Sequence, residues 1–176
     1  MTPTKVSPLP TRMPAAEGPA ALIRQLIDWF TLIPHTLIAF VARFSIAAVF
    51  WNSGQTKIEG LAINLVNGEF VLGWPRLSDN AVTLFQYEYN LPLLPPALAA
   101  TMAATAEHLF PILLLVGLAT RFSALALLGM TMVIQIFVYP GAYATHGTWA
   151  AVLLLLMAHG PGRLSIDHWI ASRHAG

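Results

Sequence analysis

Residues 35–57, HTLIAFVARFSIAAVFWNSGQTK, and residues 97–118, ALAATMAATAEHLFPILLLVGL, decide the fold of this chain. Each stretch is long and apolar, yet the first contains Arg43 and the second contains Glu107. An ionised side chain near the centre of a bilayer costs about 2.5 to 3.5 kcal/mol, so such residues normally face a protein interior or a water-filled pocket. The two opposite charges therefore either lock the fold or form its site.

The composition of the whole chain favours a membrane environment. Hydrophobic residues make up 56% of the 176 residues and charged residues only 10%, and the mean hydropathy is +0.65. Because average soluble domains carry about 25% charged residues, we expect an integral membrane protein. The net charge of +1 gives no indication of a nucleic-acid partner. The chain has no cysteine, which excludes thiol redox chemistry and thiolate metal sites on the chain itself.

Four stretches are long enough, or nearly long enough, to cross a bilayer as helices. A spanning helix needs about 20 mostly apolar residues, because each residue rises ~1.5 Å through a hydrocarbon core of ~30 Å. The expected spans are residues 35–56, 97–118, 122–139 and 148–159, the last of them short. Alanines along the second span favour close packing of helices. The sequence thus predicts an all-α, integral membrane four-helix bundle.

The segments outside the spans predict a tail at each end of the chain. Residues 1–19 contain five of the 13 prolines and no apolar periodicity, so we expect a disordered cytoplasmic tail. Residues 20–33 have the pattern of a short helix on the membrane surface, with an extension of the first span as the alternative. The four-helix domain is expected over residues 20–170, followed by a tail at 171–176.

A second short interfacial helix is expected after the fourth span. The segment Gly160, Pro161 and Gly162 should end that span. Ser165 can cap a new helix, with Asp167 in its first turn where a negative charge suits the helix dipole.

The distribution of lysine and arginine predicts the orientation. Six of these residues flank the spans on the side of the termini and two on the side of the long connection, which places both termini in the cytoplasm. The connection, residues 58–96, is too rich in aromatic and aliphatic residues for disorder. We expect it to fold as an extracytoplasmic cap on the bundle, with Trp74, Tyr87 and Tyr89 at the outer interface.

One group of candidate site residues lies inside the spans. Arg43 and Glu107 have expected depths of about 12 and 16 Å, so they are within reach of each other if their helices are neighbours. A structural ion pair and a role in proton or substrate handling both stay open, and the adjacent His108 could share a proton with Glu107. Gln135 lies within an apolar span, where its amide needs a hydrogen-bonding partner.

A second group is expected nearer the outer face. It consists of Gln55, Lys57, Glu88, Tyr89, His146 and Trp149. These residues either line an outward-facing pocket or reach the headgroups without a role, as side chains at helix ends commonly do. We expect neither haem nor a metal ion, because the histidines do not match in depth and no diagnostic ligand spacing is present.

Several segments, taken in order, resemble the DoxX family of small four-helix bacterial membrane proteins. The features are Arg43 and the SGxxK of the first span, Glu107 followed by a proline and the GLxTR turn, and the closing GPGxLSxD. They cover roughly residues 43–170, and their joint order and spacing carry the resemblance. Members of the family resemble the small membrane subunit of a thiosulfate:quinone oxidoreductase, and others have been linked to oxidative-stress complexes or to copper-handling gene clusters.

The resemblance implies a multi-pass protein of the bacterial inner membrane. It suggests the membrane subunit of a redox-linked complex that binds a quinone or a small sulfur compound, or an accessory protein in metal or oxidative-stress handling. The chain would hold no cofactor of its own beyond such a quinone, and an accessory role is favoured over independent catalysis. The implied partners are membrane lipid, a protein from the same operon and further copies of the chain. A small oligomeric transporter or channel and a purely structural membrane anchor are the alternatives.

Overall fold

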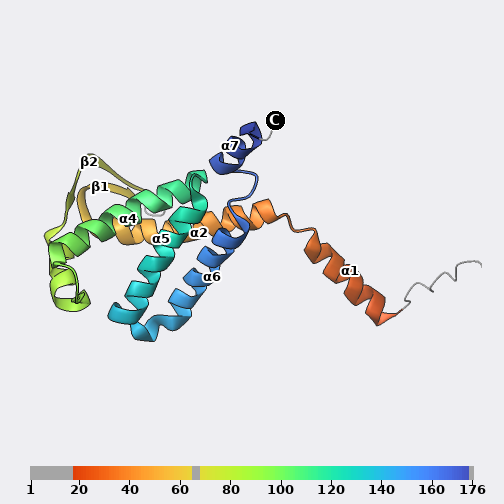
Figure 1. The fold of residues 1–176 in the computed structure, drawn as a ribbon, viewed down its shortest axis with the longest axis horizontal. Coiled ribbons are helices and arrows are strands. Elements are labelled where there is room, and N and C mark those ends of the chain that lie inside the picture. Colours follow the sequence, from red (N-terminus) through yellow and green to blue (C-terminus); the bar gives the residue numbers. More distant parts are fainter. Residues whose placement is uncertain (1–17, 65–67, 175–176) are drawn as a thin grey trace, which may run out of the picture. The chain divides into compact units, whose positions relative to one another are not determined.

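Four long apolar helices form a bundle (Figure 1). The structure is a computed structural model that describes residues 18–64 and 68–174, so nearly all of the tail expected at residues 1–19 lies outside the described part. The helices are α2 (His35–Gln55), α4 (Pro96–Val116), α5 (Thr120–Val133) with its π-helical continuation η2 (Ile134–Val138), and α6 (Tyr143–His159). By length and composition each of the four, with its adjoining turn, can cross a membrane. The predicted all-α membrane bundle is confirmed.

The fourth span is longer than the sequence predicts. A 3-10 turn, η3 (Pro140–Ala142), leads directly into α6, so the apolar helical segment runs over Pro140–His159 and contains 20 residues. The expected start at residue 148 is therefore wrong. Proline is tolerated in a first helical turn because its missing N–H would have no partner there.

The helix α1 (Pro19–Thr31) forms a unit apart from the bundle, which begins at His35. None of its residues is buried, and its large apolar side chains, such as Ile23 and Phe30, are exposed. The chain leaves the helical conformation before Pro34, because proline disfavours a helical residue in front of it. The segment is thus a separate helix and does not extend the first span.

The bundle closes around a core of small and branched side chains. Helix α2 packs against α4 and α6, and α5 packs against the same two helices. The buried core consists of Ala39, Ile46, Ala47, Phe50, Leu114, Ala124, Leu127, Leu153 and Leu156. Many large apolar side chains point outward instead, including Phe44, Phe122 and Leu154. An apolar exterior of this kind is what a membrane-spanning bundle presents to lipid.

Helix α4 contains a proline in its interior, Pro111. A helical residue normally donates its N–H to the carbonyl four positions earlier, which here belongs to Glu107. Since proline has no N–H, this carbonyl loses its usual donor.

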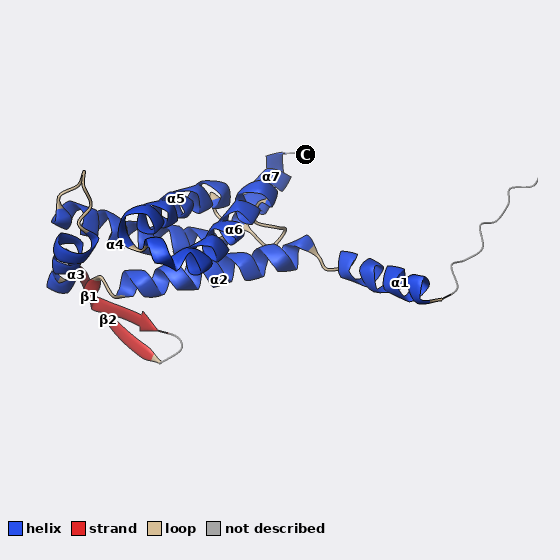
Figure 2. Ribbon diagram, turned by 90° about the horizontal axis from the view of Figure 1, so that it is seen from below, coloured by secondary structure: helices blue, strands red, loops and turns tan. Residues whose placement is uncertain are grey.

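The connection between α2 and α4 folds as a cap, as expected, but it contains an unpredicted β-hairpin. The cap consists of β1 (Ile58–Asn64), β2 (Glu69–Leu77), α3 (Asp79–Leu84) and the π-helical turn η1 (Phe85–Tyr89). The two strands are antiparallel, and Figure 2 shows the hairpin beside α2. A Cβ on Gly60 would lie 2.5 Å from the carbonyl oxygen of Trp74, and one on Gly73 2.5 Å from that of Gly60. Glycine at both positions permits the irregular pairing there.

The C-terminal segment forms the expected capped helix, and this helix extends beyond residue 170. Helix α6 ends at His159, its C-cap Gly160 has a φ of +79°, and α7 (Ile166–His174) follows. The hydroxyl of Ser165 accepts a hydrogen bond from the N–H of His168 (3.2 Å), so the predicted cap is confirmed. Residues 171–174, which were expected to belong to the tail, are helical.

Candidate functional site

Arg43 is buried at the end of the bundle where α4 ends. Its guanidinium donates to the carbonyl oxygens of Leu114 (3.0 Å) and Leu115 (3.1 Å) in α4, and to that of Leu164 (2.6 Å) before α7. The last carbonyls of a helix have no donor within the helix. Gly117 makes room for the guanidinium, since a Cβ there would lie 2.5 Å from Nη1. Arg43 therefore clamps three segments together through their backbones.

The predicted ion pair between Arg43 and Glu107 is not formed, although their helices are neighbours. Helical side chains lean toward the N-terminus of their own helix. Because α2 and α4 are antiparallel, Arg43 leans toward the His35 end of the bundle and Glu107 toward the opposite end. The expectation from depth alone was wrong for this reason.

Glu107 instead pairs with Lys57, which lies just beyond the end of α2. The Lys57 Nζ lies 2.7 Å from Oε2 of Glu107, and the two side chains are 4% and 3% exposed. Ser53 joins them: its hydroxyl donates to Oε1 of Glu107 (3.1 Å) and accepts from Lys57 (3.1 Å). Lys57 also donates to the carbonyl of Ser53 (3.2 Å). A buried pair of ions is tolerated when each is hydrogen-bonded in this way.

Gly54 sets how closely α2 and α4 approach beside this pair. A Cβ at this position would lie 2.8 Å from Cε1 of His108 and 3.0 Å from Cβ of Glu107. Any larger residue would push the two helices apart and lengthen the contacts of the ion pair.

His108 connects α4 to the hairpin. Its Nδ1 lies 2.6 Å from the carbonyl oxygen of Ala104, which places the proton on Nδ1, so Nε2 accepts from the amide of Gln55 (2.9 Å). The amide oxygen of Gln55 accepts from the N–H of Ile63 (2.7 Å), and Trp51 donates to the carbonyl of Ile63 (3.0 Å). The cap is therefore fastened to the helix that carries Glu107.

A cavity of about 230 Å³ lies beside the ion pair. Its polar wall includes Ser53, Lys57 and Glu107, and the rest is mostly apolar, with Ala103 and Ala106 of α4 among its lining. Small-molecule sites are typically apolar hollows with a few placed polar groups, and those for drug-sized ligands start at about 300 Å³. The hollow is suited to a ligand of the size of a single substituted ring.

Two tyrosines contact each other at the edge of the cavity: Tyr89 belongs to the cap, and Tyr139 lies in the turn between α5 and α6. Tyr89 lines the cavity and stacks edge-on against Tyr139, with ring centroids 5.9 Å apart, while the hydroxyl of Tyr139 donates to the carboxylate of Glu88. This hydrogen bond raises the pKa of Tyr139, and burial raises the pKa of Tyr89. Both phenols therefore stay protonated at neutral pH, and the Tyr139 hydroxyl is the donor to Glu88.

Gln135 has the hydrogen-bonding partner that its position in an apolar span requires. Its amide oxygen lies 2.7 Å from Nδ1 of His146, and its amide nitrogen donates to the carbonyl of Pro140 (2.6 Å). His146 in turn packs against Trp149, with centroids 5.1 Å apart. This group does not line the cavity beside Glu107, so the expected outer-face residues divide between two places.

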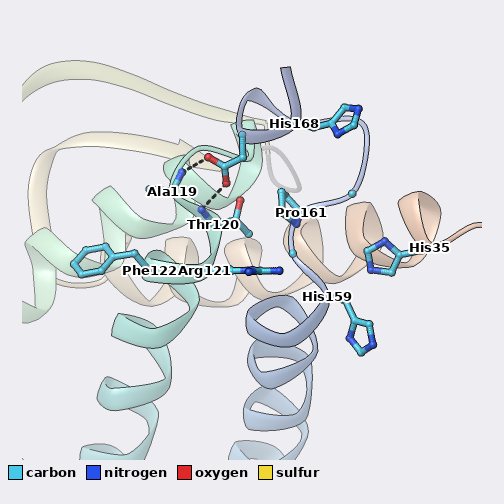
Figure 3. A pocket seen from close by; sticks show the side chains of 11 residues that line it. His35, Ala119, Thr120, Arg121, Phe122, His159, Pro161 and His168 are labelled. Atoms are coloured by element: carbon cyan, nitrogen blue, oxygen red, sulfur yellow. Dashed lines mark hydrogen bonds between the residues drawn. The ribbon is translucent and has the colours of Figure 1, made fainter. Parts of the chain in front are cut away.

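The roles of two side chains were not predicted from the sequence. Ser53, in the SGxxK segment, links Lys57 to Glu107. Asp167 lies in the first turn of its own helix, as expected, and it also accepts hydrogen bonds from the N–H groups of Ala119 (2.8 Å) and Thr120 (2.9 Å) at the start of α5 (Figure 3). Among residues 18–64 and 68–174, no group of three or more histidine, cysteine, aspartate and glutamate side chains is placed to hold a metal ion.

Comparison with known proteins identifies the family. A family model described as DoxX matches residues 38–140, which is more than half of the chain and includes Arg43, Lys57 and Glu107. No curated protein and no solved structure matches the chain.

Proposed function

This chain belongs to the DoxX family, and on that premise we propose that it is the membrane subunit of a redox-linked complex and binds a quinone headgroup. It is a multi-pass membrane protein with four helices long and apolar enough to span a bilayer. The observation that carries the proposal is the cavity of about 230 Å³, which combines apolar walls with the buried pair of Lys57 and Glu107.

The chemistry of the cavity suits a quinone. A quinone headgroup is a neutral ring with two carbonyl oxygens, so it needs apolar walls and hydrogen-bond donors. The bonds from Lys57 to Ser53, at 3.1 and 3.2 Å, are longer than its 2.7 Å contact with Glu107. One of them can turn toward a quinone carbonyl while the pair with Glu107 persists. The polar wall carries one positive and one negative charge, which favours a neutral ring over an anionic sulfur compound.

The proposed complex requires a partner that supplies electrons. Reduction of a quinone to a quinol consumes two electrons and two protons, and this chain has no cysteine to carry a thiol reaction. We assign the electrons to an oxidoreductase encoded in the same operon. The proposal also places the chain in the bacterial inner membrane with both termini in the cytoplasm, which would put the cavity in the outer half of the bilayer.

The test fills the cavity and measures quinone binding. Purified protein in lipid nanodiscs is titrated with a short-chain ubiquinone by isothermal titration calorimetry. Ala103→Phe puts a ring into the cavity and should weaken binding by roughly tenfold or more. Ala97→Phe is the matched control, because Ala97 lies exposed on the same helix and does not line the cavity.

Equal affinities in both variants and the native protein would show that the quinone does not enter this cavity. Absence of binding to the native protein would favour the alternatives of a transporter or a membrane anchor.

A further inference from the structure

A second pocket lies at the opposite end of the bundle from the hairpin. Its volume is about 560 Å³, and it is formed where α2 and α5 begin and where α6 ends and runs toward α7 (Figure 3). The cavity proposed for the quinone shares none of its lining residues. Its function is therefore a separate question from the proposed one.

Nitrogen-bearing side chains from four helices converge on this pocket. They are His35 of α2, Arg121 of α5, His159 of α6 and His168 of α7. The rings of His35 and His159 lie 5.7 Å apart. Figure 3 shows Arg121 extending from the start of α5 toward the end of α6, on the side where these two rings lie. His35, Arg121 and His159 can thus address one ligand from three helices, whereas the ring of His168 lies next to α7, apart from them (Figure 3).

These donors lack partners of opposite charge in the part of the chain that the structure describes. The carboxylate lining the pocket belongs to Asp167, and both of its oxygens already accept backbone N–H groups of α5. Between residues 18 and 174, outside the undescribed gap, the one ion pair is that of Lys57 and Glu107, so Arg121 has no carboxylate. Its hydrogen bond to the carbonyl of Ala158 is long, at 3.5 Å.

Two further observations concern side chains of the pocket that can bind an acceptor, three of them exposed imidazoles. In the described residues, the imidazoles of His35, His159 and His168 make no hydrogen bond to the protein. The hydroxyl of Thr120, which also lines the pocket and is fully buried, has no partner there. A guanidinium together with imidazole and hydroxyl donors is a suitable binding set for a phosphate group, because Arg pairs with two of its oxygens at once.

The position of the pocket along the spans bears on where such a phosphate would come from. His35, Thr120 and His159 are terminal residues of three of the four apolar spans, so the pocket lies where lipid headgroups meet the protein. Basic pockets between spanning helices on the cytoplasmic side bind acidic headgroups. We propose that this pocket binds a phosphate group, supplied by the headgroup of an anionic phospholipid.

The test compares an anionic phospholipid with one whose phosphate charge is compensated by its own choline cation, and with inorganic phosphate. The thermal unfolding of the full chain in neutral detergent is followed while phosphatidylglycerol, phosphatidylcholine or inorganic phosphate is added. Phosphatidylglycerol should raise the melting temperature more than phosphatidylcholine does, and Arg121→Gln should weaken this response by about tenfold in lipid concentration. Arg173→Gln, in α7 but outside the pocket, is the matched control and should respond like the native chain. His159→Gln provides a second pocket variant.

Each outcome decides the proposal. A selective response to phosphatidylglycerol that both pocket variants weaken supports a lipid headgroup site, and an equal response to inorganic phosphate supports a site for soluble phosphate. Equal responses to the two lipids, or a selective response that Arg121→Gln and His159→Gln leave intact, would overturn it. Because quinone binding is not measured, failure here leaves the proposed function unaffected.

Discussion

The two buried charges of the bundle, Arg43 and Glu107, lie on neighbouring helices but are stabilised in different ways. Arg43 is surrounded by backbone carbonyls from the end of α4 and the turn before α7. Glu107 is surrounded by side chains, Lys57 and Ser53, at the wall of a cavity. A site held by backbone groups has partners that substitution cannot change, whereas a site held by side chains can be altered on both sides. The first arrangement is suited to holding segments together, and the second to meeting a ligand.

The largest loss of stability is expected from Arg43→Met. The substitution leaves three buried carbonyls without their donor, and hydrogen bonds to charged groups are worth about 1.5 to 3 kcal/mol each, so we expect a loss of about 4 kcal/mol. Unfolding by SDS in mixed micelles measures it. Arg173→Met, at an exposed position, is the control and should change little. Equal stabilities of the two variants would contradict a clamp at Arg43.

A smaller loss of stability is expected at the ion pair, and a second substitution should compensate for it. Lys57→Met or Glu107→Gln alone leaves one buried partner unpaired and should cost about 3 kcal/mol in the same assay. The double variant removes both ions and should regain most of this loss, because replacing a complete buried pair is often nearly neutral. Losses that simply add in the double variant would show that the two residues do not act as a pair.

A substitution at Gly54 that separates α2 from α4 should reduce the stability by a still smaller amount. Gly54→Ala places a methyl group 2.8 Å from His108, and overpacking of this kind costs about 1 to 3 kcal/mol. Gly129→Ala is the matched control, because a Cβ at Gly129 meets no atom within 4 Å and alanine favours a helix by about 1 kcal/mol. A Gly54 variant as stable as the Gly129 variant would mean that the helices do not need this close approach.

The smallest perturbation is a single introduced cysteine, which tests whether the cap and α7 face opposite sides of the membrane. The chain has no cysteine, so each introduced cysteine is unique. In spheroplasts, an impermeant maleimide should label Asn80→Cys in the cap and should label Ser172→Cys in α7 only after permeabilisation. Labelling of both residues in intact spheroplasts would contradict an odd number of spans between Asn80 and Ser172. The reverse pattern would invert the proposed orientation.

The bundle was predictable from the sequence because apolar length decides which segments span a membrane. The need of Gln135 for a partner was equally visible, since an amide in an apolar span has no water to bind. The pairing of Glu107 with Lys57 was not predictable, because counting residues gives the depth of a residue along a helix but not the direction in which its side chain leans. The hairpin was missed because its strands contain residues that disfavour a strand, Gly60 in β1 and Gly73 and Pro75 in β2. The cross-strand fit of Gly60 and Gly73 has no signal within either strand alone.

Pro111 gives α4 a break in its hydrogen-bond ladder at Glu107, the residue that carries the charge. Breaks of this kind are where membrane helices bend. The ladder is interrupted between the stretch that lines the cavity and the stretch whose last carbonyls bind Arg43. A pivot at this point would let the part of the helix beside the cap swing and reshape the cavity while its other end keeps the hydrogen bonds to Arg43.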